Sequence, residues 1–287
     1  MMKLFDNQSI VEYKGKHRAL HIVDGTNMFC RACFAGKSIS ESRKDLQMAV
    51  GIFLRLFKVV MKNQPTHVAI VFDSGRITFR HKLCPKYKAD RTKSYIQNKA
   101  TKMSVIKNML EYSGFAVIDS KQYEADDIIG SLANRYSKKL SVRIFSEDKD
   151  FVQCITDNVT LYKNNTVYNK EVCFKKYGIM PDQFIDYLTL VGDSIDGIDG
   201  VSKWGPKSAA QYLTEYGTIE NIVGKPMGKS LSTINTTDLG YIKMLTAIKK
   251  NIDVVSSTAA LTVKKKDIDS VAKLIKKYGI TLSGIYG

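Results

Sequence analysis

HVAIVFD, at residues 67–73, is an apolar run of β-forming residues that ends on an aspartate, and it indicates a mostly buried strand. Similar runs predict strands at 18–24 (RALHIVD), 115–119 (FAVID), 141–146 (SVRIFS) and 159–163 (VTLYK). Between the strands, apolar residues recur at helical spacing over 46–62 and from Glu124 to Tyr136. Strands that alternate with helices form βαβ units, so we predict an α/β fold with a mainly parallel central sheet flanked by helices.

The second half of the chain has a different pattern of predicted secondary structure. After Gly178, Gly and Pro turns join short helical patterns, and we predict no clear strands but helices at 181–191, 206–216, 237–251 and 268–277. A chain of 287 residues can form one large domain or two modest ones. We therefore place a boundary near 178, between an α/β half at 1–178 and a helical half at 179–287.

The composition is that of a globular protein, with 44% hydrophobic and 25% charged residues. No apolar run approaches the roughly 18 residues of a membrane span, and the N-terminus lacks the apolar stretch of a secretory signal. We therefore expect a cytoplasmic protein. The odd number of cysteines disfavours a disulfide framework. The CxxC at Cys30 and Cys33 has no second pair at zinc spacing, so we interpret the cysteines as small apolar residues.

The chain is strongly basic, with 44 Lys and Arg against 28 Asp and Glu and a formal net charge of +16. This excess favours an anionic partner, and nucleic acid is the first candidate because its phosphates offer a basic surface many contacts. A membrane-surface helix would need an apolar face opposite its basic face, and none stands out. The alternative is that the charge only keeps the protein soluble.

Cations are concentrated just after the predicted strand 67–73. The segment 76–107 has a single acid, Asp90, and Tyr87 and Tyr95 lie among its cations, which are Arg76, Arg80, Lys82, Lys86, Lys88, Arg91, Lys93, Lys99, Lys102 and Lys107. Such charge runs are often solvated faces. Because the segment follows the strand that ends at Asp73, we expect it to lie over the carboxyl edge of the sheet, and we favour phosphate binding.

Acidic residues, in contrast, gather in short clusters, mostly where an apolar run ends. They are Asp24, Asp73, Glu124, Asp126, Asp127, Asp148, Asp150, Asp193 and Asp196. Open α/β sheets bind ligands at the carboxyl ends of their strands, which is where the prediction places Asp24, Asp73 and Asp148. If EADD opens a helix, Glu124 and Asp127 share a face and Asp126 is angled away. If SEDKD stays extended, Asp148 and Asp150 point the same way.

So many carboxylates in one place would repel one another unless cations were bound. Oxygen ligands suit Mg²⁺, whereas imidazole or thiolate ligands would indicate zinc or copper. Two divalent ions about 4 Å apart can activate a water and stabilise the departing oxygen in phosphoryl hydrolysis. An isolated Asp is more often a helix cap or a surface charge, but several clusters at compatible places predict a two-metal site that acts on phosphates.

Six short motifs follow one another along the chain: VDGTN at 23–27, FD at 72–73, YKADR at 87–91, EADD at 124–127, DKD at 148–150 and GDSIDGIDGVSKWGPKSAA at 192–210. In this order and spacing they resemble the 5′-nuclease family, which includes flap endonucleases, the 5′-exonuclease domain of bacterial DNA polymerase I and stand-alone bacteriophage 5′-exonucleases. The resemblance covers about residues 18–217. Since the 287 residues include no polymerase domain, we expect a free-standing enzyme most like the phage versions.

The resemblance implies a PIN-like nuclease core at 1–178, with a basic helical arch over about 76–107 through which a 5′ single strand threads. It assigns the clustered acids to two Mg²⁺ ions, with Mn²⁺ as a substitute. Asp24 and the EADD acids would face one ion, Asp193 and Asp196 the other, and Asp148 and Asp150 the middle. Lys88 and Arg91 would act on the scissile phosphate, and Asp148 would count as catalytic because it is a ligand shared by the two ions. Tyr87 would stack on a base.

The segment 184–217 resembles the family's helix–three-turn–helix, a duplex-binding element. Its glycines, Gly200 and Gly205 among them, would let backbone amides approach phosphates, and Lys207 stands where a phosphate contact is expected. Some relatives hold K⁺ in this turn. Lys203 and Trp204 stand where relatives commonly have Gly and Ile. A side chain at 203 either strains the turn and weakens a K⁺ site or adds a phosphate contact, whereas Trp204 is expected to pack internally.

The resulting hypothesis is a Mg²⁺-dependent, structure-specific 5′-nuclease, both a 5′-3′ exonuclease and a flap endonuclease, in replication or repair. It would hydrolyse DNA phosphodiesters to leave a 5′-phosphate and a 3′-hydroxyl. Its partners would be DNA with 5′ flaps, 5′ overhangs or branched junctions, and RNA–DNA hybrids. We expect the enzyme to be a monomer that does not bind membranes. Two alternatives stay open: a ribonuclease of the related acidic-site folds that cuts single strands, and a non-enzymatic protein that protects branched junctions.

Overall fold

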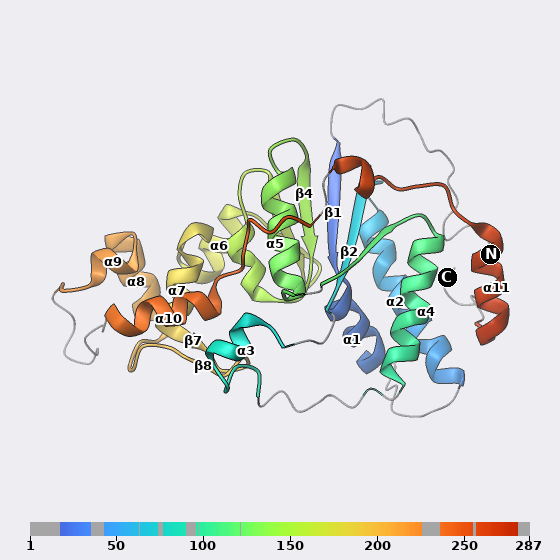
Figure 1. Cartoon of the computed structure of the whole chain (residues 1–287). Helices are drawn as coiled ribbons and strands as arrows, with labels where there is room; N and C mark the ends of the chain where they lie inside the picture. Colours follow the sequence, from blue (N-terminus) through green and yellow to red (C-terminus); the bar gives the residue numbers. More distant parts are fainter. Residues whose placement is uncertain are drawn as a thin grey trace.

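The computed structural model describes residues 18–35, 43–62, 64–73, 77–89, 96, 98–120, 122–225, 236–254 and 257–280. Its central sheet has the order β3-β2-β1-β4-β5-β6 (Figure 1). The strands are β1 (Ala19–Asp24), β2 (His67–Phe72), β3 (Ala116–Asp119), β4 (Ser141–Phe145), β5 (Val159–Lys163) and β6 (Thr166–Tyr168). Only β6 is antiparallel to its neighbour, so the predicted α/β fold with a mainly parallel sheet is confirmed.

The two faces of the sheet carry separate apolar layers, as the period of two along a strand requires. In β2, Val68, Ile70 and Phe72 join the layer of α1 (Gly25–Ala35), α2 (Arg43–Met61) and α4 (Lys99–Tyr112). Ala69 and Val71 join the opposite layer with α5 (Ala125–Tyr136). Both faces are therefore covered by helices, which explains the unbroken apolar runs in the sequence.

The order of the strands reverses at β1. The chain proceeds from β1 to β2 and β3 on one side and then places β4 on the other side of β1. Ligands of open α/β sheets bind at such a switch point, outside the carboxyl ends of the strands. Asp24 is the last residue of β1 and therefore lies at this crevice.

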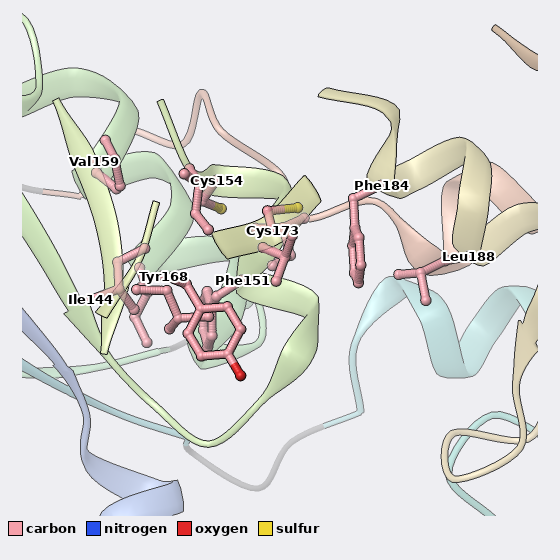
Figure 2. Packing of buried hydrophobic residues seen from close by; sticks show 14 of the residues in the cluster. Ile144, Phe151, Cys154, Val159, Tyr168, Cys173, Phe184 and Leu188 are labelled. Atoms are coloured by element: carbon pink, nitrogen blue, oxygen red, sulfur yellow. The ribbon is translucent and has the colours of Figure 1, made fainter. Parts of the chain in front are cut away.

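The α/β half also contains the 3₁₀ helix η2 (Lys149–Cys154), and it ends with α6 (Lys170–Tyr177), which follows β6; the helical half comes after it. The helical half contains η3 (Pro181–Gln183), α7 (Phe184–Val191), β7 (Gly192–Asp193), β8 (Ile198–Asp199), α8 (Pro206–Tyr216), α9 (Ile219–Ile222) and α10 (Thr236–Thr246). The short β7–β8 hairpin was not predicted, because a two-residue strand has no periodicity. Figure 2 shows the apolar cluster that joins the halves: Ile144, Val159 and Tyr168 of the sheet, Phe151 and Cys154 of η2, Cys173 of α6, and Phe184 and Leu188 of α7.

After α10 the chain returns to the α/β half. Residues 247–254, which we call the strap, run in an irregular extended path beside α5, and η4 (Thr258–Leu261) packs near β2. The final helix α11 (Ile268–Tyr278) packs against α4 (Figure 1). The prediction of helix at 237–251 is therefore wrong beyond Thr246. The strap's N–H groups at Ile248, Lys249 and Ile252 donate to side chains of η2 and α5 instead of to a helical turn.

Among the residues that the structure describes, no helix is both long enough and apolar enough to cross a membrane. None of the described cysteines forms a disulfide, and Cys33, Cys154 and Cys173 are buried. Burial raises the pKa of the Cys154 and Cys173 thiols to about 12, so both stay protonated at neutral pH. These cysteines pack as small apolar side chains, as we interpreted them from the sequence.

Candidate metal centre and nucleic-acid interface

Asp24 ends β1, Asp73 follows the neighbouring strand β2, and both carboxylates accept hydrogen bonds. Asp24 accepts from the Asn27 main-chain N–H at 2.9 Å and from the Ser146 hydroxyl, at the end of β4, at 2.9 Å. Asp73 accepts from the main-chain N–H of Ala125, the first residue of α5, at 2.8 Å. Three parallel strands and one helix N-terminus therefore place these two acids at a common edge of the sheet.

Asp148 caps η2, and its carboxylate accepts from the main-chain N–H of Asp150 at 2.9 Å. SEDKD therefore does not stay extended, which was the condition for Asp148 and Asp150 to point the same way, because the cap starts a 3₁₀ helix at Lys149. Asp148 nonetheless lies centrally among the acids: its charge raises the pKa values of Asp24, Asp126 and Asp150. Asp148 is the residue that links the acids of β1, α5 and η2.

Asp150, Asp193 and Asp196 form the tightest group, with one carboxylate oxygen from each lying within 4.8 Å of the others. Asp193 ends the short strand β7, and its side chain accepts from the Ile195 main-chain N–H at 3.1 Å. The ammonium of Lys149 contacts both Asp150 and Asp193. Sequence reasoning missed Lys149, although its place between two candidate ligands in DKD was a usable signal.

Burial and mutual repulsion disfavour full ionisation of the acids in the cluster. Burial and repulsion from Asp73 raise the pKa of Asp24 to about 7, against the hydrogen bond from Asn27. Burial and the charge of Asp148 likewise raise the pKa of Asp150 to about 7, and that of Asp126 well above its usual value. The donor set is all carboxylate oxygen, which fits Mg²⁺ or Mn²⁺ rather than a soft metal.

Glu124 and Asp127 have a different environment. They share a face of α5, as predicted for i and i+3, but that face is turned to Arg80, whose guanidinium pairs with Asp127 at 2.8 Å and with Glu124 at 3.3 Å. Glu124 also accepts from the Tyr87 hydroxyl at 2.9 Å and from Lys88 Nζ at 3.0 Å. Burial opposes ionisation of Glu124, but Lys88 and Arg80 outweigh it and hold its pKa below the usual value. It is therefore Asp126 that faces the other acids.

The basic segment reaches the site through residues 84–89, which we call the arch base. Burial disfavours the charge of Lys88, but Glu124 outweighs this and raises the pKa of the ammonium. Tyr87 is only 3% exposed, and its hydroxyl donates to Glu124. Arg76, Asp90, Arg91, Lys93 and Tyr95 lie outside the described residues.

The turn between α7 and α8 is held by close backbone approach. A Cβ on Gly200 would lie 2.4 Å from the Val191 carbonyl carbon, so this glycine is required for packing. Lys203 has a left-handed φ of 64°, which is unusual for a residue with a side chain. Lys203 and Lys207 are exposed, and Gly205 caps α8. Trp204 is buried against Tyr212, as expected for internal packing.

Two family models together match most of the chain. Residues 19–178 match the 5′-3′ exonuclease N-terminal resolvase-like domain, and residues 179–269 match the 5′-3′ exonuclease C-terminal SAM fold. A 5′-3′ exonuclease of Aquifex aeolicus is 33% identical over 91% of this chain and 92% of its own length. DNA polymerase I of Bacillus subtilis is 31% identical over 92% of this chain, which spans 32% of the polymerase.

Solved structures agree in fold. T5 5′-exonuclease with bound zinc superposes with a TM-score of 0.67 at 21% identity, covering 91% of this chain and 98% of that protein. The catalytic core of Rad2 in complex with DNA superposes with a TM-score of 0.61 at 16% identity, covering 91% and 87%. The fold is therefore shared with these structures, and the matched family models together with the Aquifex relative show that the chain belongs to the 5′-3′ exonuclease family.

Proposed function

We propose that this protein is a Mg²⁺-dependent, structure-specific 5′-nuclease that acts on flaps, overhangs and branched DNA in replication or repair. One observation carries the proposal: acids from β1, β2, α5, η2 and the β7–β8 turn converge beside Lys88 of the arch base. A carboxylate cluster next to a buried ammonium suits a phosphodiester, whose charge needs both metal ligands and a direct cation.

The proposed metal ligands are the acids that face one another. They are Asp24, Asp73, Asp126, Asp148, Asp150, Asp193 and Asp196. Bound Mg²⁺ or Mn²⁺ supplies Lewis-acid activation of the attacking water and of the leaving oxygen. Glu124 and Asp127 are left out of the set because their oxygens accept from Arg80 and other donors. Lys88, together with Arg91, offsets charge on the scissile phosphate, and hydrolysis leaves a 5′-phosphate and a 3′-hydroxyl.

The proposed duplex interface is the turn between α7 and α8. Gly205 opens α8, an eleven-residue helix whose N-terminus favours anions, and Lys203 and Lys207 are exposed beside it. The same turn is the proposed place for K⁺. The 5′ single strand would pass the arch base toward the acids. We further propose that the enzyme acts as a monomer in the cytoplasm and accepts RNA–DNA hybrids.

The test is a 5′-flap duplex labelled at the 5′ end of the flap, incubated with enzyme in Mg²⁺ and, separately, in EDTA. A product released near the junction only in Mg²⁺ is expected. Asp148→Asn should abolish cleavage and largely preserve binding, because Asp148 lies between the two groups of acids. Asp157→Asn is the matched control, since its side chain is 85% exposed and pairs with Lys170 away from the site.

The alternatives predict different outcomes of the same assay. Cleavage of single-stranded RNA in preference to a branched DNA of matched sequence would favour the ribonuclease. Tight binding of the junction without a product in either condition would favour a protein that protects junctions. Cleavage by Asp148→Asn near the wild-type rate would overturn the central metal position of Asp148.

A further inference from the structure

Arg80, on the short helix α3 (Phe79–Leu83), is only 2% exposed and yet fully hydrogen-bonded. Its Nε donates to the Leu245 carbonyl at 3.0 Å, and one terminal nitrogen donates to Glu124 and Asp127. The other terminal nitrogen donates to Asp127 at 2.8 Å and to the Ala247 carbonyl at 2.6 Å. All five N–H donors of the guanidinium are thus used.

These bonds join parts of the chain that are distant in sequence. Asp127 and Glu124 belong to the start of α5, whereas Leu245 and Ala247 lie where α10 passes into the strap. Helix α10 itself packs against α7 and β8 of the proposed duplex-binding part. Arg80 is therefore a direct link between the position of α10 and the N-terminus of the helix that bears Asp126.

The strap has other anchors that do not touch Glu124. Gln153 of η2 donates to the Thr246 carbonyl at 3.1 Å and accepts from the Ile248 N–H at 2.8 Å. Ser131 of α5 donates to the Lys249 carbonyl at 3.1 Å and accepts from the Ile252 N–H at 3.0 Å. Docking of the strap alone therefore does not require an arginine at position 80.

What distinguishes Arg80 is the carboxylate it shares with the arch base. The same Glu124 oxygen, Oε2, accepts from Arg80, from the Tyr87 hydroxyl and from Lys88 Nζ. The other oxygen accepts from Thr78, the N-cap of α3, at 3.3 Å. The orientation of Glu124 thereby bears on the position of the Lys88 ammonium, and Arg80 is one of the groups that hold this carboxylate.

We propose that Arg80 is a positioning residue that acts through Glu124 on Lys88 and couples the docking of α10 to the geometry of the nuclease site. The inference rests on the proposed function for its catalytic readout. A lysine at position 80 keeps the positive charge but has only three donors and no planar fork, so it cannot hold Asp127 in a bidentate pair and Glu124 at once.

The experiment compares Arg80→Lys with Ser131→Ala, which loosens the strap without touching Glu124. Single-turnover cleavage of the flap duplex in Mg²⁺, the dissociation constant for the duplex in EDTA, and the thermal midpoint are measured for both. Arg80→Lys is expected to cleave about 100-fold more slowly at saturating DNA, as for a misplaced catalytic group, with unchanged duplex affinity. Ser131→Ala should lower the thermal midpoint and retain the wild-type rate.

Hydrogen exchange of residues 84–89 supplies a readout that does not depend on cleavage. Exchange there should accelerate in Arg80→Lys and in Asp127→Asn, but not in Ser131→Ala. Equal rate losses in Arg80→Lys and Ser131→Ala, or unchanged exchange at the arch base, would overturn the positioning role. If the wild-type protein itself does not cleave, the proposed nuclease function fails, and the exchange data alone decide the role of Arg80.

Discussion

The main-chain N–H of Lys88 donates to the carbonyl oxygen of Asp196 at 2.8 Å, so the arch base is attached to the turn that carries two candidate metal ligands. The ammonium of the same lysine lies 3.8 Å from the Asp196 carboxylate and 3.0 Å from Glu124. Lys88 adopts a left-handed φ of 54° to make both contacts. The cation proposed for the scissile phosphate is thus joined directly to Asp196, one of the acids proposed for the metal.

Replacing Gly197 should disrupt this connection. Gly197 has a φ of 67°, and a Cβ there would lie 2.6 Å from the Lys86 carbonyl oxygen. Gly197→Ala should lower the free energy of unfolding by more than the roughly 1–2 kcal/mol that a left-handed conformation costs, because the overlap with the Lys86 backbone adds to that strain. The variant should also cleave more slowly. Urea unfolding measures the loss. In the control, Gly51→Ala, the Cβ meets no described atom within 4 Å, so a gain of about 0.5–1 kcal/mol is expected in helix α2.

Removing the charge of Lys88 should impair chemistry more than binding. Lys88→Gln is expected to lower the single-turnover rate by about 100- to 1000-fold, the usual loss for a donor that stabilises transition-state charge. Lys86 is an exposed cation of the same turn and is the matched control. Lys86→Gln should change the rate little and weaken binding slightly. Equal rate losses in the two variants would argue that the arch base contributes only general positive charge.

Substitutions of Lys203 can distinguish the effect of backbone strain on stability from the effect of the lysine charge on duplex binding. Lys203→Gly releases about 1–2 kcal/mol of left-handed strain, which exceeds the 0.5–1 kcal/mol that a glycine loses in backbone entropy, so the thermal midpoint should rise. A plot of log affinity against log salt concentration has a negative slope, and this slope should become shallower by about 1 if Lys203 contacts a phosphate. Lys203→Asn should reproduce the change in slope with a smaller rise in the midpoint. An unchanged slope in both variants would remove Lys203 from the interface.

The raised pKa of a buried acid determines how the stability of the metal-free protein should depend on pH. Because the pKa of Asp150 is about 7 in the fold, against 3.8 ordinarily, the folded state holds a proton that the unfolded state releases between those values. This contribution to stability therefore falls as pH rises from about 4 to 7. In EDTA, Asp150→Asn should be more stable than wild type at about pH 8 and closer to it at about pH 5.

Added Mg²⁺ provides the complementary measurement. Mg²⁺ that binds only the folded state should raise the thermal midpoint of the wild type. At a Mg²⁺ concentration one hundred times the dissociation constant, the free energy of unfolding should increase by about 2.7 kcal/mol. Asp150→Asn should gain less, because it lacks one of the three carboxylates that lie within 4.8 Å of one another. A larger gain for the variant than for wild type would place Asp150 outside the metal site.

The pattern of apolar residues along the sequence was sufficient to predict the parallel sheet with its helices and the edge of the sheet where the acids lie. Burial on both sheet faces requires unbroken apolar runs, so β1, β2 and β4 were visible as strands, and Asp24 and Asp73 were predicted at their carboxyl ends. Lys149 could also have been noticed, since a cation between two aspartates of one motif has few other partners nearby.

Which acid meets which partner depended on contacts between residues far apart in the chain. Arg80 stands 44 and 47 residues before Glu124 and Asp127, and no periodicity links them, yet their pairing turns both carboxylates toward α3. The end of α10 at Thr246 likewise follows from side chains of α5 and η2 that bind the strap. Hydrogen bonding and apolar periodicity act within a few residues, whereas the pairing of buried charges is settled only when the chain is folded.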